Sequence, residues 1–337
     1  MGRIVETSLP RTTAEAAGVD EQAIQAWLAA LGELNEIHSA MLLRHGQVVA
    51  EHYWPPHTAD EFSNRFSLSK TVTALAVGIA INEGLFKLDD RVIDLLGFDS
   101  KDAPENRNLK DLTVRHLLTM SAGNQDFEYF LEQFKTKKAI AQEDWVAGLL
   151  KTPFAYEPGA RFSYNTATTF LLSAIIHKLT GERLLNYVKA KLFQPLGIKG
   201  VKWERNPAGI DMGGTGIQLK TEDIAKLGQL ILNKGEWQGT QIVPAKWIEA
   251  MTTKQIDNSG HVRWVEDETH DNDWEQGYGY QMWICRNDAV RGDGMYGQFM
   301  IIWPKYDAVI AMTANTDDMP AQLNTLWTHL EKAFALE

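Results

Sequence analysis

The sequence predicts an α/β (α+β) fold, in which an antiparallel sheet built from both termini is flanked by helices and carries an inserted, mostly helical lobe. Three observations support this class: strand patterns near the N-terminus, strand patterns again after residue 278, and helical patterns between them. The length of 337 residues is enough for two lobes. We expect a single unit over residues 1–337, with 1–62 and 260–337 forming the sheet lobe and 63–259 the helical lobe.

The first elements are a helix and a hairpin. Apolar side chains at Ile24, Trp27 and Leu31 form one helical stripe, which predicts a helix over residues 19–34. Two apolar runs, 41–43 and 48–50, flank a turn that contains a glycine, and this pattern is typical of a β-hairpin.

The later elements follow the same reasoning. The apolar patterns predict helices over 67–85, 114–120, 166–179, 221–232 and 321–334, and strands over 278–283, 298–303 and 308–313.

Composition excludes several classes of protein. Hydrophobic residues make up 44% and charged residues 23%, as in globular proteins. The 33 basic and 44 acidic residues give a net charge of −11, which disfavours nucleic acid and anionic membranes as partners. The single cysteine, Cys285, excludes an internal disulfide, and the first residues lack the apolar core of a signal peptide. We therefore expect a cytoplasmic protein, and the oligomeric state stays open.

One short motif carries chemistry. In Ser67-Leu68-Ser69-Lys70 the serine and the lysine are three residues apart, so on a helix they share a face. A lysine amine activates a serine hydroxyl when burial lowers the pKa of the amine, and the apolar run after Lys70 predicts a buried helix. However, one Ser-x-x-Lys is expected by chance in a chain of this length, and Ser67 alone is equally suited to cap a helix.

The surrounding sequence resembles the serine β-lactamase and penicillin-binding-protein-like superfamily, in the branch of class C β-lactamases, family VIII esterases and 6-aminohexanoate-dimer hydrolase. The resemblance extends from about residue 38 to residue 315. It rests on four ordered segments: Arg65–Thr71, Leu85–Val92, Leu112–Gly123 and Glu157–Asn165. It implies a β-lactamase/transpeptidase-like fold with Ser67 as nucleophile and Lys70 as its base.

The resemblance also implies that Tyr164 is the second proton-transfer group. The usual family pattern is Tyr-x-Asn, whereas here Asn165 follows the tyrosine directly and Thr166 stands at the third position. Asn165 is therefore a candidate substrate-binding residue. The alternative for Tyr164 is a structural tyrosine at a helix start.

A third family element is a strand with Lys-Thr-Gly or His-x-Gly opposite the serine. The corresponding segment, residues 291–299, has neither motif. By resemblance, Gly294 lets the backbone approach the substrate, and Met295 N–H joins Ser67 N–H in an oxyanion hole. Arg291 is a candidate for the missing cation, since a guanidinium binds a carboxylate with two hydrogen bonds. The nearby aromatic residues Trp264, Trp274, Trp283 and Tyr296 fit either a pocket wall or the core.

These features predict a serine hydrolase that cleaves a small ester or amide through an acyl-enzyme, without metal or cofactor. A β-lactamase or D,D-peptidase is the first alternative, disfavoured by the missing Lys-Thr-Gly. A non-catalytic ligand-binding member of the fold is the second, disfavoured because Ser67, Lys70 and Tyr164 are all present.

Overall fold

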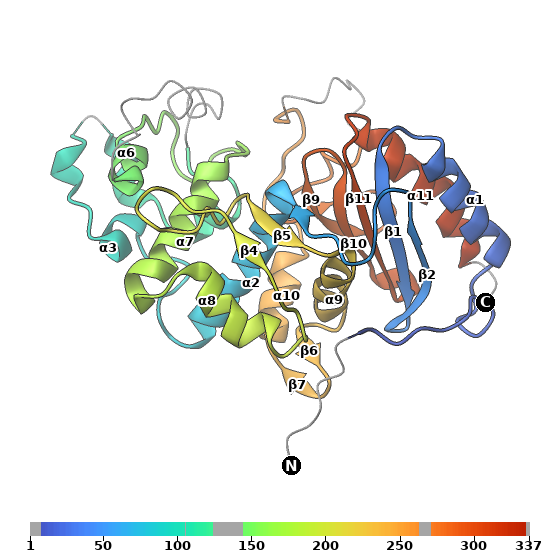
Figure 1. Cartoon of the computed structure of the whole chain (residues 1–337). Helices are drawn as coiled ribbons and strands as arrows, with labels where there is room; N and C mark the ends of the chain where they lie inside the picture. Colours follow the sequence, from blue (N-terminus) through green and yellow to red (C-terminus); the bar gives the residue numbers. More distant parts are fainter. Residues whose placement is uncertain (1–7, 105, 124–143, 263–270, 335–337) are drawn as a thin grey trace, which may run out of the picture.

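A six-stranded antiparallel sheet organises one lobe of the computed structural model, which describes residues 8–104, 106–123, 144–262 and 271–334 (Figure 1). The sheet joins the two ends of the chain because β1 pairs with β11. In spatial order the strands are β2 (Gln47–Tyr53), β1 (Ile37–Arg44), β11 (Ala308–Ala314), β10 (Gln298–Trp303), β9 (Val290–Gly294) and β8 (Trp283–Ile284).

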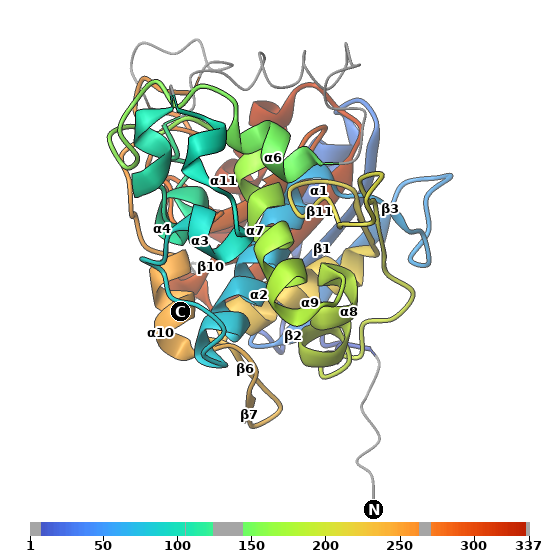
Figure 2. The ribbon, with the colours of Figure 1, turned by 90° about the vertical axis from the view of Figure 1, so that its left-hand side faces the viewer.

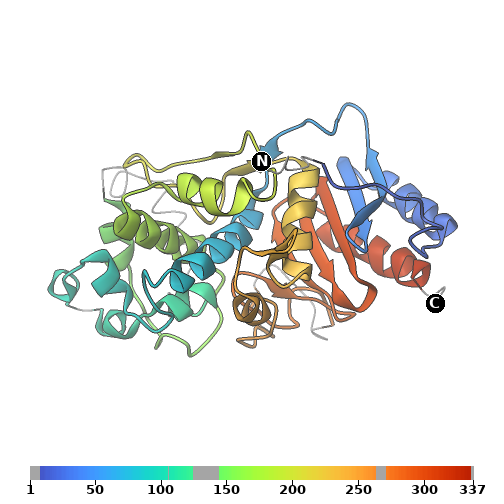
Figure 3. The ribbon, with the colours of Figure 1, turned by 90° about the horizontal axis from the view of Figure 1, so that it is seen from below.

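Helices cover both faces of this sheet. Helices α1 (Glu21–Gly32) and α11 (Met319–Ala333) pack together on the outer face, and α9 (Thr221–Leu232) lies on the face toward the second lobe (Figures 1 and 3). Every residue of β10 and β11 is buried as a result. This explains why these strands are mostly apolar, apart from Gln298 and Thr313, rather than alternating.

The second lobe is mostly helical and stands beside the sheet lobe (Figures 1 and 2). Its helices and turns are η1 (Phe66–Leu68), α2 (Ser69–Asn82), α3 (Val92–Leu96), η2 (Ser100–Asp102), η3 (Arg107–Asp111), α4 (Val114–Leu118), α6 (Trp145–Leu150), α7 (Thr166–Thr180), α8 (Leu184–Val188), the π-helical η4 (Lys189–Phe193) and α10 (Ala245–Met251). The remaining elements are β3 (Ser63–Asn64), β4 (Lys202–Trp203), β5 (Ile217–Leu219), β6 (Glu236–Trp237), β7 (Thr240–Gln241) and η5 (Pro304–Tyr306).

Helix α2 lies between the two lobes and is buried on every side from Ser69 to Ala80. Gly78 allows the Trp247 indole to approach the helix, because a Cβ at residue 78 would lie 2.2 Å from that ring. The same indole donates a hydrogen bond of 3.0 Å to the carbonyl of Ala74. Neither α2 nor any other helix in the described part of the chain is long and apolar enough to cross a membrane.

Most elements expected from the sequence are confirmed, including the first helix, the hairpin, and the helices beginning near residues 67, 166, 221 and 321. The strand predicted over 278–283 is wrong, because only Trp283–Ile284 forms a strand there. Gln281 adopts a φ of 57°, which interrupts an extended chain. Helix α9 contacts β10 and β11 of the main sheet, although it lies within residues 63–259, which were expected to form the helical lobe. The boundaries of the two lobes stay a prediction.

Candidate active site

Ser67 lies in a strained turn directly before α2. Phe66 has a φ of 44°, a left-handed conformation that is costly for a bulky side chain. Two hydrogen bonds hold this turn: Phe66 N–H donates to Asn64 Oδ1 at 2.8 Å, and Arg65 N–H donates to the carbonyl of Ile217 at 2.8 Å. The turn leaves Ser67 half-buried while the next residues enter the core.

Lys70 is buried in the first turn of α2 and points its amine at the serine. Its Nζ donates hydrogen bonds to Ser67 Oγ at 2.9 Å, to Gly214 O at 2.7 Å and to Thr166 Oγ1 at 3.1 Å. Burial lowers the pKa of Lys70 from 10.5 to about 7, and the negative charge of Asp293 opposes this shift. Near neutral pH about half of the molecules therefore carry a neutral amine.

The three oxygen atoms that accept hydrogen bonds from Lys70 Nζ are placed so that this amine can act as a base. When the ammonium loses one proton, two N–H groups remain for Gly214 O and Thr166 Oγ1. The lone pair then faces Ser67 Oγ, which is the group to be deprotonated. The geometry thus supports proton transfer from the serine to the lysine.

Thr166 is a residue of the site to which the sequence analysis gave no role. It occupies the third position of the family's Tyr-x-Asn pattern and accepts from Lys70, and this spacing was the available signal. Asn165, which we expected to bind substrate, is 2% exposed and caps helix α7. Its Oδ1 accepts a hydrogen bond from Ala167 N–H at 2.8 Å, so this oxygen is not available to a substrate.

The carbonyl oxygen of Gly214, which accepts a hydrogen bond from Lys70, is a second part of the site that the sequence did not predict. Every residue has a backbone carbonyl, so the side-chain pattern does not indicate which one is used. A buried loop holds it in place: Asp211 O accepts from Ser173 Oγ, and Gly213 O accepts from Thr73 Oγ1 at 2.8 Å. A Cβ at residue 214 would lie 2.8 Å from Thr166 Cγ2, so glycine permits the close packing.

Tyr164 comes to the serine from the segment before α7. Its side chain is hydrogen-bonded to Ser67, and Lys70 Nζ lies 4.9 Å from the centroid of its ring. Burial raises the pKa of Tyr164 well above its ordinary value, so the phenol is neutral at pH 7. The ring stacks on Trp283, with centroids 5.4 Å apart and planes inclined by 22°.

Trp283 is in turn held by a buried ion pair on β9. The indole Nε1–H donates to Asp293 Oδ1 at 2.9 Å, and Arg291 Nε donates to Asp293 Oδ2 at 3.1 Å. Arg291 is fully buried, and its guanidinium also donates to the carbonyl of Asp273 and to Cys285 Sγ. The expectation that Arg291 receives a substrate carboxylate is therefore wrong, because this group is enclosed and already paired.

The end of β9 reaches the turn that carries the serine. A Cβ at Gly294 would lie 2.2 Å from the carbonyl oxygen of Arg65, so only glycine permits this approach. Met295 follows at the surface and is 56% exposed. The Phe66 ring contacts Tyr296 edge-on, with centroids 5.4 Å apart. Gly294 and Met295 thus lie where the backbone of β9 meets the Ser67 turn. Trp264 lies outside the described residues.

Within the described ranges, no three His, Cys, Asp or Glu side chains are grouped so as to hold a metal ion.

A serine, a lysine and a tyrosine that meet between a sheet lobe and a helical lobe define a β-lactamase-like serine hydrolase. The chain belongs to the Beta-lactamase family, whose model matches residues 38–333. It is similar to the 6-aminohexanoate-dimer hydrolase of Paenarthrobacter ureafaciens, with 22% identity over 300 residues that cover 82% of this chain and 72% of that protein.

Two solved structures show the same fold. A family VIII carboxylesterase has a TM-score of 0.70 and 18% identity, covering 93% of this chain and 96% of its own. A hydrolase with promiscuous acyltransferase activity has a TM-score of 0.72 and 17% identity, covering 93% and 99%.

Proposed function

We propose that this hydrolase cleaves a small ester or amide through an acyl-enzyme on Ser67. The observation that carries the proposal is the buried Lys70 amine, which lies 2.9 Å from Ser67 Oγ and has its pKa lowered to about 7. A serine hydroxyl needs such a base before it can attack a carbonyl.

In the first half-reaction, Ser67 Oγ attacks the carbonyl carbon and its proton passes to Lys70. The negative oxygen that forms is stabilised by the backbone N–H groups of Ser67 and Met295, on the two backbones that meet at Gly294. The intermediate then breaks its bond to the leaving group. Tyr164 donates the proton that the leaving group needs and recovers one from Lys70.

In the second half-reaction, water attacks the acyl-enzyme. The water gives a proton to Tyr164 or Lys70, and the bond between Ser67 Oγ and the acyl carbon breaks as the serine takes that proton back. The products are the free acid and the unmodified enzyme. Atoms and protons balance over these two half-reactions, with the substrate, water and the named side chains alone.

The names of the similar proteins support this substrate class, because one is a 6-aminohexanoate-dimer hydrolase and another a carboxylesterase. A β-lactamase or D,D-peptidase is less well supported. The Lys-Thr-Gly cation is missing, and Arg291 does not replace it.

The test is hydrolysis of p-nitrophenyl butyrate by the wild type and by Ser67→Ala, with a chromogenic cephalosporin alongside. We expect ester cleavage by the wild type alone, together with a butyryl mass increment that maps to Ser67 after acid quench. Faster turnover of the cephalosporin than of the ester would favour the β-lactamase. Equal inertness of both proteins would favour a non-catalytic ligand-binding protein.

A further inference from the structure

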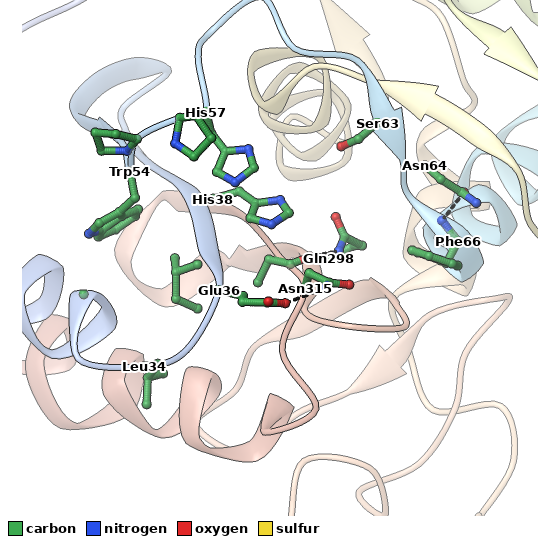
Figure 4. A pocket seen from close by; sticks show the side chains of 15 residues that line it. Leu34, Glu36, His38, Trp54, His57, Ser63, Asn64, Phe66, Gln298 and Asn315 are labelled. Carbon is green, nitrogen blue, oxygen red and sulfur yellow. Dashed lines mark hydrogen bonds between the residues drawn. The ribbon is translucent and has the colours of Figure 1, made fainter.

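A groove with a volume of about 660 Å³ lies beside the active-site turn, where the central strands of the main sheet begin or end (Figure 4). Its walls come from the end of α1, the start of β1, the segment after β2, the β3–η1 turn, the start of β10 and the end of β11. The lining residues that matter below are Glu36, His38, Trp54, His57, Phe66 and Asn315. The mechanism proposed above uses none of them.

The groove is adjacent to the two turns that carry the proposed catalytic groups. Phe66 lines the groove and directly precedes Ser67. Gln298 also lines it, and its Nε2 lies 3.4 Å from the carbonyl oxygen of Met295. The groove is therefore bounded by the same two turns that carry the nucleophile and the proposed oxyanion donor. A substrate whose carbonyl lies at Ser67 has this space beside it for a second, remote group.

The lining of the groove contains a carboxylate, that of Glu36. Glu36 is exposed, and its partner is the neutral amide of Asn315, which donates to Oε2 at 2.5 Å. No lysine or arginine is among the described residues that line the groove. The neighbouring guanidinium, Arg65, is 2% exposed and donates to Leu219 O and to Gln298 Oε1. The carboxylate of Glu36 thus remains uncompensated by a cation in the groove.

Two imidazoles, His38 and His57, also line the groove. His38 and His57 stack with centroids 3.7 Å apart. Burial and the neighbouring His57 lower the pKa of His38, so its imidazole is neutral at pH 7. His57 Nδ1 lies 2.8 Å from a carboxylate oxygen of Glu61, so a carboxylate stands directly behind this imidazole.

The aromatic residues in the walls complete the chemistry. Trp54 stands at one end of the groove, and Phe66 at the other (Figure 4). An ammonium group is stabilised by a carboxylate and by the face of an aromatic ring, and tryptophan is the strongest of these rings. A carboxylate ligand would meet Glu36 without a compensating cation.

We propose that this groove binds a positively charged ammonium group carried by the substrate at a distance from its scissile carbonyl. The inference rests on the proposed function for the position of the carbonyl at Ser67. It adds a class of substrate: cationic esters or amides in preference to neutral or anionic ones.

The kinetic test uses isosteric pairs that differ in one charge. On the leaving-group side the pair is butyrylcholine and 3,3-dimethylbutyl butyrate. On the acyl side it is the p-nitrophenyl esters of 4-(trimethylammonio)butyrate and 5,5-dimethylhexanoate. In one of the two pairs we expect the cationic ester to have a KM lower by about fivefold or more.

The matched variants are Glu36→Gln and Glu33→Gln. Both remove one exposed carboxylate near the end of α1, but only Glu36 lines the groove. We expect Glu36→Gln to remove the preference for the cation and Glu33→Gln to keep it. Equal KM values within both pairs, or a preference that survives Glu36→Gln, would overturn the proposal.

A binding measurement separates this inference from the proposed function. Titration of Ser67→Ala with choline and with 3,3-dimethylbutanol measures binding to the groove without turnover. We expect choline to bind more tightly than 3,3-dimethylbutanol. This difference should disappear when Glu36→Gln is added to Ser67→Ala. Absence of ester hydrolysis by the wild type, together with intact choline binding, would refute the acyl-enzyme alone. Hydrolysis without charge discrimination, together with equal binding of the two alcohols, would refute the groove proposal alone.

Discussion

Trp283 lies against Tyr164 as a stacked ring, and the indole N–H of the same tryptophan is fixed by Asp293. This contact joins two parts of the chain that the sequence separates widely, the sheet edge and the start of α7. The orientation of the tyrosine that contacts Ser67 therefore depends on a buried ion pair behind the tryptophan. The consequences of this arrangement, and of the environment of Lys70, are measurable.

The activity should rise with pH through about 7, because the neutral form of Lys70 is the base and its pKa lies there. Below that pH, kcat/KM should fall tenfold per pH unit. Lys70→Arg should be inactive throughout, since a guanidinium stays protonated. The measurement is the pH profile for p-nitrophenyl butyrate, corrected for spontaneous hydrolysis. A wild-type profile that is flat from pH 5 to 9 would exclude Lys70 as the base.

The same residue should make stability depend on pH. Between about pH 7 and 10.5 the unfolded state holds a proton on Lys70 that the folded state has released. The free energy of unfolding should therefore rise with pH in this window, by about 1 kcal/mol per pH unit. The difference between the wild type and Lys70→Met in urea unfolding at pH 7, 8 and 9 isolates this contribution. A constant difference across these pH values would contradict the lowered pKa.

Tyr164→Phe should lower kcat by about 10²- to 10⁴-fold, because the hydroxyl that contacts Ser67 is lost while the ring can still stack on Trp283. The control is Tyr278→Phe, which changes a buried tyrosine packed edge-on against the same tryptophan. Similar losses in both variants would indicate that aromatic packing, rather than proton transfer, explains the effect. Steady-state kinetics and thermal unfolding of each variant provide the comparison.

Asp293→Asn should move the acidic limb of the pH profile to lower pH. The negative charge of Asp293 raises the pKa of Lys70, so its removal lets that pKa fall further. The variant should also be less stable by about 3 kcal/mol, because Arg291 loses its buried carboxylate partner. Loss of stability without a shifted limb would assign Asp293 a structural role only.

Thr166 and Asn165 are neighbours with different expected roles. Thr166→Val removes an acceptor of Lys70 at nearly constant volume and should lower kcat by about tenfold. Asn165→Ala removes the cap of α7 and should cost about 1 kcal/mol of stability. Urea unfolding and kinetics on both variants distinguish the two roles. A larger kcat loss for Asn165→Ala than for Thr166→Val, at temperatures where both are folded, would reverse the assignment.

The sequence predicted those parts of the site that leave a pattern in side chains. Ser67 and Lys70 share a helical turn, and the family resemblance supplied Tyr164 on a segment far along the chain. Gly214 was not predictable, because it contributes a carbonyl whose position depends on contacts among several helices. Arg291 has the right chemistry for a substrate carboxylate, but only the packing around β9 reveals that Asp293 already occupies it.

Residues 278–283 illustrate the same limit of sequence-based prediction for the fold. Residues 278–283 have strand-forming side chains, yet most of the segment forms no strand because its backbone groups bond elsewhere: Gln281 N–H donates to the carbonyl of Leu118. Such a partner lies outside any local sequence window. By contrast, the residues of β10 and β11 are buried on both faces, so their mostly apolar runs predict their structure well.

The pairing of β1 with β11 has a consequence for biosynthesis. The nucleophile and its base are translated in the first quarter of the chain, whereas the strand that closes the sheet beside β1 emerges last. A ribosome-bound chain that ends before β9 has Ser67 and Lys70 but lacks β9, β10, β11 and Met295. Such long-range pairing delays folding. A stop codon before β9 is therefore expected to yield an inactive fragment, because the partner strand of β1 in the centre of the sheet is missing.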